Sequence, residues 1–401
     1  MLNPDFAIFQ DNMFIAARRL MADLTPPEEL GEMLLTIGEP QMPPPEFVQE
    51  IMADRRTSWQ FYPKPDGSAQ FRQAVHDYIG RRFGRPASAR LDPDRHILPV
   101  PGTREPLHML GWLKKATKPH PVALVTNPFY PAWRTGALAS GGEIIYLNAA
   151  AENGFLPDLA AVPDDLLART VIVYLCAPSN PQGTLASRAW LTKAVQLARE
   201  HDFLLVMDEC YIDIWREEKP LGLLEVAAGI DGPDAEPLAN LVVVNSLSKR
   251  SNAAGLRGGF LCGDARIIEA YRLLAANGLA LVPDGLLSVA AALYSDDRHN
   301  ADIRAHYDKS FALASRALNI VPPKGGFFLW LPVGDDKAFA RDLYQQTGLR
   351  VMPGSCMGVV SDGINPAAGF VRAALVADHP QIAAALDRLA PLWQRLQEQT
   401  G

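Results

Sequence analysis

Short, almost purely apolar runs recur between residues 122 and 262, and segments of helical character separate them. Runs that do not alternate apolar with polar residues are typical of strands buried on both faces. Between two of these runs, the segment 186–201 has its apolar residues spaced for one buried helix face. This succession predicts an α/β fold with a large, mostly parallel sheet covered by helices. The expected strands are 122–125, 143–147, 171–175, 203–207, 241–244 and 258–262.

The pattern changes after about residue 290, where strands and helices mix without the regular alternation. A chain of 401 residues is also long for one small core and favours two domains. The proline-rich segment 40–45 is typical of a linker, which lets the residues before it join a second domain. We therefore predict a large domain over 46–285 and a smaller α+β domain that combines 1–45 with 286–401. Its expected elements are strands at 327–331, 349–352 and 370–375 and a helix from about 379.

The charge pattern argues against nucleic-acid binding. The chain has 38 basic and 45 acidic residues, which gives a net charge of −7. It contains no basic block and no stripe of Lys and Arg interleaved with aromatic residues. The four cysteines are scattered without the pairing of a metal site, and we expect reduced, mostly buried thiols.

The sequence favours a soluble, cytoplasmic protein without membrane contact. Residues 1–5 lack the charged and then apolar pattern of a signal peptide. The apolar stretch 273–294 includes Asn277, Pro283 and Asp284, which a bilayer span would not tolerate together. We expect that stretch to belong to the core.

Lys249 is the first candidate for chemistry. It follows the apolar run 241–244, lies among the hydroxyls of Ser246 and Ser248, and precedes Arg257 by a short loop. Ligands bind at the carboxyl ends of strands in open α/β sheets. There a lysine amine can form a Schiff base with an aldehyde cofactor, while hydroxyls and an arginine hold a phosphate. Taken alone, this motif is more often a solvated lysine at a strand end.

Three further strand-to-loop junctions hold residues that suit the same cofactor. Gly102 and Thr103 open a helix whose free N–H groups can cradle a phosphate, although both residues also serve as ordinary helix caps. Tyr130, on a proline-flanked turn, can stack on a planar ring or simply pack in the core. Asn180 lies on another such turn, which its amide can equally well stabilise.

Asp208 ends a very apolar strand, where a carboxylate is costly to bury without a positive partner. A protonated pyridine nitrogen is such a partner, and Tyr211 is close enough in sequence to reach a neighbouring ring oxygen. A capping aspartate is the alternative. Lysine, aspartate, aromatic plate and phosphate cradle together are what pyridoxal phosphate requires. Their order and joint presence carry more weight than any one of them.

With these motifs the chain resembles the fold-type-I pyridoxal-phosphate enzymes of the class I/II aminotransferases, over nearly all of its 401 residues. The resemblance implies that Lys249 is the Schiff-base lysine and that Asp208 is the partner of the ring nitrogen. It places Tyr211 and Asn180 at the ring oxygen, and Tyr130 against the ring. The residues it implies for the phosphate site are Gly102, Thr103, Arg104, Ser246, Ser248 and Arg257.

The resemblance also implies residues for the substrate and for a second subunit. Arg372 matches the arginine that binds the substrate α-carboxylate, and Gly38 and Asn180 lie beside that group. A planar guanidinium binds a carboxylate through two hydrogen bonds, which supports Arg372 independently, although a surface charge at a strand edge is the alternative. Tyr62 matches a tyrosine that the other subunit contributes to the phosphate. We therefore expect a homodimer that acts on amino acids and 2-oxo acids.

For the substrate, the segments 246–252, 127–130 and 363–376 are similar to those of the group that transaminates N-succinyl-LL-2,6-diaminopimelate with 2-oxoglutarate. Segments 274–279 and 355–358 depart from that group, and both are candidates to line the distal half of the substrate pocket.

Other functions remain open at this point. The alternatives are an aminotransferase for aromatic, branched or acidic amino acids, and a pyridoxal-phosphate carbon–sulfur β-lyase. A regulatory module on the same fold is remote, because the roughly 35 residues before Gly38 show no basic recognition helix.

Overall fold

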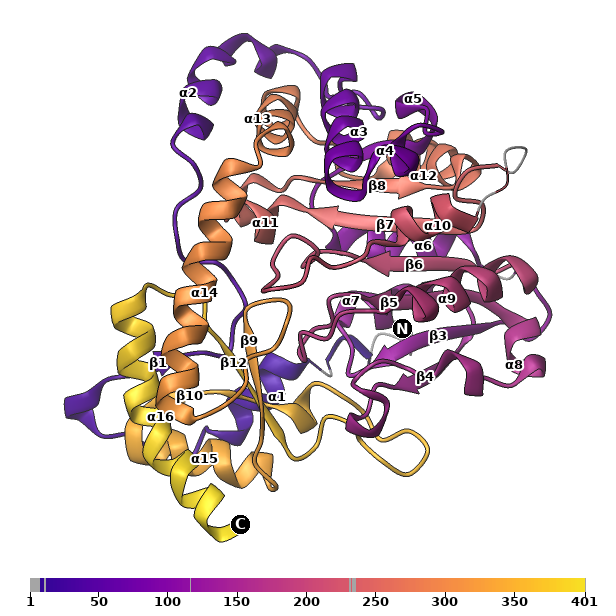
Figure 1. Cartoon of the computed structure of the whole chain (residues 1–401). Coiled ribbons are helices and arrows are strands. Elements are labelled where there is room, and N and C mark those ends of the chain that lie inside the picture. The colour runs from indigo at the N-terminus through magenta and orange to yellow at the C-terminus, as the bar shows by residue number, and fades with distance from the viewer. Residues whose placement is uncertain (1–7, 11, 116, 231, 233–235, 401) are drawn as a thin grey trace, which may run out of the picture.

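The computed structural model describes residues 8–10, 12–115, 117–230, 232 and 236–400. Its largest feature is a seven-stranded sheet in the order β2-β8-β7-β6-β5-β3-β4 (Figure 1). β8 runs antiparallel to both of its neighbours, whereas the pairs from β7 to β4 are parallel. The predicted fold class is confirmed. The strands are β2 (Ile97–Val100), β3 (Val122–Asn127), β4 (Glu143–Asn148), β5 (Thr170–Cys176), β6 (Leu204–Asp208), β7 (Leu241–Ser246) and β8 (Gly259–Gly263).

Helices cover both faces of this sheet, as the unbroken apolar runs require. Successive residues of a strand point to opposite faces, so Val206 packs in one core cluster while Leu205 and Met207 pack in the other. On the Val206 side lie α6 (Arg104–Leu113), α7 (Pro131–Ala139) and α12 (Ala265–Gly278). On the other side lie α3 (Ala69–Phe83), α9 (Arg188–Glu200), α10 (Leu223–Ile230) and α13 (Asp284–Ser295).

The carboxyl-terminal part forms smaller sheets. Strands β9 (Phe328–Pro332), β12 (Phe370–Ala374) and β11 (Met352–Pro353) pair antiparallel, and β10 (Leu349–Arg350) pairs parallel with β1 (Met33–Leu34). The predicted strand 349–352 is thus divided between two sheets. Around them lie α1 (Met13–Leu20), α14 (Arg298–Leu318), α15 (Asp336–Thr347) and α16 (His379–Thr400). In Figure 1, α14 runs from beside the large sheet down to the small ones.

The pairing of β1 with β10 brings the amino-terminal segment against the carboxyl-terminal part, while the boundaries 46–285 and 1–45 with 286–401 stay a prediction.

The stretch 273–294 divides between α12 and α13 and packs against the sheet, as expected. Among the described residues, no helix combines the length and apolarity needed to cross a bilayer. None of the four cysteines, which all lie in the described part of the chain, forms a disulfide bond. The shorter helices are α2 (Phe47–Asp54), α4 (Arg85–Ser88), α5 (Pro93–His96), α8 (Asp164–Arg169) and α11 (Leu247–Arg250).

Candidate active site

A cavity of about 790 Å³ lies at the carboxyl ends of three parallel strands. Its wall contains Cys176, Asp208 and Ser246, the last residues of β5, β6 and β7, together with Phe328 of β9 and Arg372 of β12. Strand ends separated by long stretches of sequence therefore meet at one place, as open α/β sheets require. The predicted site residues that line the cavity are Gly38, Thr103, Arg104, Tyr130, Asn180, Asp208, Tyr211, Ser246, Ser248, Lys249, Arg257 and Arg372.

Lys249 lies in the short helix α11, directly after β7, and its Nζ donates to the carbonyl oxygen of Gly38 at 2.5 Å. Burial lowers the pKa of Lys249, and the nearby positive charges of Arg372 and Arg257 act in the same direction. Glu39 opposes that shift. A lysine with a lowered pKa more readily supplies the neutral amine that attacks an aldehyde. The environment of Lys249 is therefore not that of a solvated surface charge.

Asp208 is buried, and its carboxylate accepts hydrogen bonds from uncharged donors. The Trp133 indole donates to Oδ2 at 3.1 Å, and the Cys210 amide donates to Oδ1 at 3.1 Å. Burial raises the pKa of Asp208, although these hydrogen bonds and the charge of Lys249 oppose the rise. A buried acid in this setting gains from a cationic partner, such as a protonated ring nitrogen.

Asn180 joins the two ends of the site. Its Nδ2 donates to the hydroxyl of Tyr211 at 3.3 Å, and its Oδ1 accepts from Nη1 of Arg372 at 3.1 Å. Arg372 also donates from Nη2 to the carbonyl of Thr36 at 2.8 Å, and its guanidinium lies 4.4 Å above the ring of Phe328. Arg372 is only 2% exposed, and its buried Nε has no hydrogen-bond partner among the described residues. Burial lowers the pKa of Arg372 to about 10, and a bound carboxylate would satisfy this group.

Arg257 lines another part of the cavity, whereas Gly102 does not line it and lies against the Arg257 guanidinium. Gly102 has φ +78°, and a Cβ there would lie 2.3 Å from Nη2 of Arg257, so any larger residue would displace the guanidinium. Arg257 is held by the carbonyls of Pro101 (3.0 Å) and Ala254 (2.9 Å). Helix α6 begins at Arg104 beside this cradle, with Thr103 as its N-cap. A helix N-terminus, serine hydroxyls and a guanidinium make a phosphate-binding set.

Residues 31–389 of the sequence match the model of the protein family "Aminotransferase class I and II". That match covers most of the chain. The chain belongs to the class I and II aminotransferase family. It is a pyridoxal-phosphate-dependent transaminase, which confirms the enzyme class and the cofactor expected from its sequence.

The names of individual relatives of this aminotransferase differ in the substrate that they give. The chain is 29% identical over 374 residues to an LL-diaminopimelate aminotransferase of Dehalococcoides mccartyi, a match that covers 90% of this chain and 91% of the relative. An aminotransferase of Neisseria meningitidis superposes with a TM-score of 0.89 at 30% identity, covering 97% of this chain and 100% of the other. A probable N-succinyldiaminopimelate aminotransferase of Thermus thermophilus superposes with a TM-score of 0.80 at 25% identity, covering 95% and 100%.

The residues of the cavity fit pyridoxal phosphate. The buried acid Asp208, the amine of Lys249 and the Gly102–Arg257 cradle lie around one space, which matches the ring nitrogen, the aldehyde and the phosphate of the cofactor. The individual roles predicted for these residues stay proposals. Tyr62 does not line the cavity and is 98% exposed.

Several residues of the site were missed in the sequence. Trp133 lies one helical turn after Tyr130, and its indole N–H donates to Asp208. The signal in the sequence was that a buried tryptophan N–H needs a hydrogen-bond acceptor. Tyr130 itself accepts from Nε of Arg104 at 3.1 Å. Helix α1 contributes Met13, Phe14, Ala17, Arg18 and Met21 to the wall, and the helical spacing of its apolar residues was visible in the sequence.

The two segments expected to line the distal half of the substrate pocket do not line this cavity of the single chain. Among the described residues that line the cavity, none comes from 274–279 or 355–358. Met357 instead forms a core cluster with Met13, Ala17 and Met352, and Cys356 packs against this cluster. The residues at which these two segments differ from the succinyl-specific group therefore do not line the cavity.

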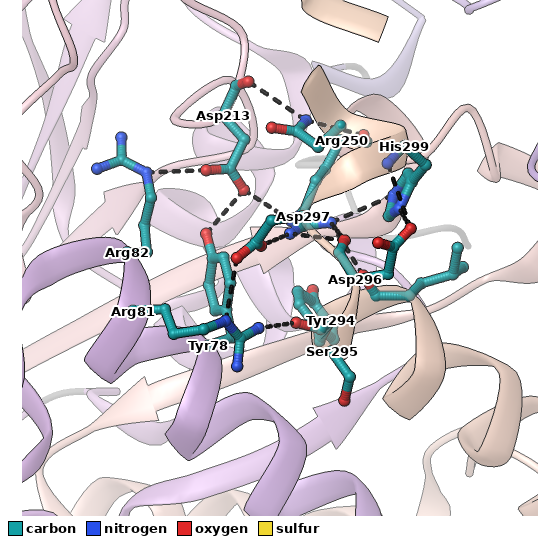
Figure 2. A network of polar contacts seen from close by, with 12 residues as sticks. Tyr78, Arg81, Arg82, Asp213, Arg250, Tyr294, Ser295, Asp296, Asp297 and His299 are labelled. Carbon is teal, nitrogen blue, oxygen red and sulfur yellow. Dashed lines mark hydrogen bonds and ion pairs between the residues drawn. The ribbon is translucent and has the colours of Figure 1, made fainter. Parts of the chain in front are cut away.

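A buried network of charges supports the loops that carry Lys249 and Tyr211. Figure 2 shows Asp213 between Tyr78, Arg82 and Arg250. Asp213 accepts from the Tyr78 hydroxyl at 2.8 Å and from Nε of Arg82 at 2.9 Å, and it forms an ion pair with Nε of Arg250 at 2.9 Å. Burial alone would raise the pKa of Asp213, but the guanidinium groups of Arg250 and Arg82 outweigh it and the pKa is lowered. Because Arg250 follows Lys249 and Asp213 lies two residues after Tyr211, the network fixes both site loops.

Asp213→Asn is expected to destabilise the fold by about 3–5 kcal/mol, because it removes the counter-charge of the buried Arg82 and leaves the buried Arg250 with only the exposed Asp297. The matched control is Asp297→Asn, since Asp297 also pairs with Arg250, at 2.8 Å, but its side chain is 56% exposed. That change is expected to cost less than about 1 kcal/mol. Urea unfolding of the three proteins measures the difference, and equal losses for the two variants would contradict the role given to Asp213.

Proposed function

We propose that this aminotransferase transfers the amino group of a diaminopimelate to 2-oxoglutarate, with N-succinyl-LL-2,6-diaminopimelate as the donor. Support comes from the segment 246–252, from the Thermus thermophilus structure and from the size of the cavity. LL-2,6-diaminopimelate itself is the second candidate, which the names of the curated relatives favour. Both donors share one carbon chain, which would place the enzyme in diaminopimelate and lysine biosynthesis.

The observation that carries this proposal is the buried guanidinium of Arg372, which lines the same cavity as Lys249 and whose Nε has no hydrogen-bond partner among the described residues. The α-amino acids and 2-oxo acids that we propose as substrates all present an α-carboxylate. In our proposal that carboxylate binds Arg372, with Asn180 holding the guanidinium in plane from the other side. Binding there aims the α-carbon toward the amine of Lys249.

The remaining residues act on protons and charge. Bound pyridoxal phosphate supplies an electron sink for the bond that breaks at the α-carbon. In our proposal the freed amine of Lys249 removes the proton from the substrate α-carbon and later delivers it to another carbon of the reacting system. The lowered pKa of Lys249 favours the removal, because it keeps the amine neutral. Asp208 keeps the ring nitrogen protonated, and Tyr211 with Asn180 holds the ring oxygen. Tyr130 covers the ring, while Ser246, Ser248 and Arg257 bind the phosphate.

We also propose that two chains complete each site. Tyr62 is 98% exposed and lies beside Phe61 and Trp59, which are 80% and 51% exposed. Three neighbouring exposed aromatic side chains favour a protein interface, and the phosphate of a partner chain is the target that the family resemblance gives to Tyr62. Sedimentation of the cofactor-loaded protein should give twice the chain mass of 43.8 kDa. An active monomer would contradict the shared site.

The donor is tested by steady-state kinetics of the cofactor-loaded protein with 2-oxoglutarate as acceptor. We expect kcat/KM for N-succinyl-LL-2,6-diaminopimelate to exceed that for aspartate, phenylalanine and leucine by about a hundredfold or more. A higher value for free LL-2,6-diaminopimelate would select the second candidate. If aspartate, phenylalanine or leucine is the best donor, the proposal fails, and release of pyruvate from cystathionine would identify a carbon–sulfur lyase.

A further inference from the structure

The cavity wall contains one positive side chain without a partner in the described part of the chain. Six cationic residues line the cavity, and five of them are held by contacts already described or by Glu32, which pairs with Arg350 at 2.9 Å. Arg18 is the exception. It makes no side-chain hydrogen bond or ion pair with any described residue, and its side chain is exposed at the edge of the cavity. An unpaired guanidinium at a binding cavity points to an anionic group on the ligand.

Helix α1 holds Arg18 in a fixed place. Asn12 caps the helix by accepting from the Phe14 amide at 2.9 Å. Met13 and Ala17 are 9% and 7% exposed, and they form a small core cluster with Met352 and Met357. Arg18 directly follows Ala17 and is therefore carried on a packed helix rather than on a loose segment.

Arg350 is a second cation of the cavity wall, and the strand pairing indicates how far along the chain it lies from the position opposite Arg372. In the strand pairing, Met352 is opposite Arg372, and Arg350 precedes Met352 by two residues, or about 6–7 Å along the chain. Besides its bond to Glu32, Arg350 has a buried Nε with no hydrogen-bond partner among the described residues. Arg350 thus adds a positive charge to the cavity wall two residues from Met352, which packs against Met13 and Ala17 of α1.

The wall around these cations is apolar. Leu34 and Ile37 line the cavity although they are 49% and 46% exposed, and Met13, Met21 and Met352 line it as well. Exposed apolar side chains beside a cavity favour an occupant with an apolar body. A methylene chain fits this surface, because it buries the apolar residues and needs no polar partner.

We propose that Arg18, supported by Arg350, binds a second carboxylate at the far end of the substrate. The ligand class is a long, unbranched amino or oxo acid whose α-carboxylate binds Arg372, whose methylene chain lies on the apolar wall, and whose terminal carboxylate binds Arg18. This inference deepens the proposed function and rests on it, since both diaminopimelate donors end in a carboxylate. It makes Arg18 a residue that determines specificity.

A different role for Arg18 is a favourable charge at the carboxyl end of α1, where the helix dipole attracts cations. Arg19 shares that position, is equally exposed and does not line the cavity. It is therefore a matched control for charge, helix position and exposure. Methionine is the replacement at both sites, because it keeps the length of the side chain and a good helix propensity.

The test is calorimetric binding of two unreactive ligands to the cofactor-loaded protein. Pimelate carries carboxylates at both ends of a seven-carbon chain, and heptanoate has the same chain with one. We expect the unmodified protein and Arg19→Met to bind pimelate about tenfold more tightly than heptanoate, as a charge-assisted contact implies. In Arg18→Met the two dissociation constants should agree within about threefold.

Two results would overturn the inference: no preference for pimelate in the unmodified protein, or the same loss of preference in both arginine variants. Neither pimelate nor heptanoate is an amino donor, so the result of this binding test does not depend on which donor the enzyme uses. If the kinetics exclude both diaminopimelates but Arg18→Met alone loses the pimelate preference, the distal site stands and only the donor is wrong.

Discussion

Lys249→Ala is expected to lower transamination turnover by roughly ten-thousand-fold, because in our proposal Lys249 supplies both the amine that holds the cofactor and the group that moves the α-proton. Among the described residues that line the cavity, Lys249 is the only lysine, so no neighbour can replace it. Turnover with the best donor and 2-oxoglutarate measures the effect, at saturating pyridoxal phosphate. Far-ultraviolet circular dichroism should be unchanged, since Lys249 has few structural contacts beyond the Gly38 carbonyl.

Lys324→Ala is the control for loss of a lysine as such. Lys324 is 61% exposed in its side chain and pairs with Glu218 at the surface. This variant should keep its turnover within about twofold. A Lys249→Ala protein with more than a tenth of the original turnover would show that another group carries the chemistry.

Arg372→Met is expected to reduce kcat/KM for the amino donor by roughly a hundred- to a thousandfold. The guanidinium is buried, and removing one partner of a buried charged contact costs about 2–5 kcal/mol. Arg372→Lys should recover only a small part, because an ammonium cannot form two parallel hydrogen bonds to a carboxylate. The same steady-state assay measures both variants.

The affinity for pyridoxal phosphate separates substrate binding from general damage to the site. Arg372 contacts Asn180 and Thr36, whereas the phosphate cradle lies at Gly102 and Arg257. The cofactor dissociation constant should therefore change by less than about threefold in Arg372→Lys. If cofactor affinity and kcat/KM fell together, Arg372 would be a structural residue, and the α-carboxylate would need another partner.

The sequence predicted the large sheet well because that sheet has a strong local signal. Buried parallel strands are apolar throughout, so the runs ending at Asp208 and Ser246 stood out without any knowledge of their neighbours. Candidate residues such as Asp208, Ser246 and Lys249 were recognised for the same reason, because they end or follow those strands, whereas Gly38, Tyr62 and Arg372 came from the family resemblance. The structure places all the candidate residues except Gly102 and Tyr62 around one cavity, which the order of the motifs alone could not demonstrate.

Features that depend on contacts between distant segments were not predicted. Strand β2 is only four residues long and contains Pro99, so its pairing with β8 was not visible. The division at Val351 follows from two different partner strands, one of them formed by residues 33–34. Asp213 had no local signal either, since its partners Tyr78 and Arg82 lie more than 130 residues away in sequence.

The segments that line the substrate pocket were likewise not predictable from the sequence alone. The resemblance by segment drew attention to 274–279 and 355–358, but neither segment lines the cavity of the described chain, whereas residues of α1 do. Specificity in this chain is thus expected from an amino-terminal helix whose position is set by packing on Met352 and Met357. Only the tertiary structure shows that Arg18 faces the same cavity as Lys249.

The most direct test of the central claim is chemical trapping of the cofactor. Protein loaded with pyridoxal phosphate would be reduced with borohydride, digested and mapped by mass spectrometry. The account predicts one stoichiometric phosphopyridoxyl group, attached to Lys249, and no trapped group in Lys249→Ala. A stoichiometric group on another lysine, or none in the unmodified protein, would contradict the assignment of this cavity as the active site.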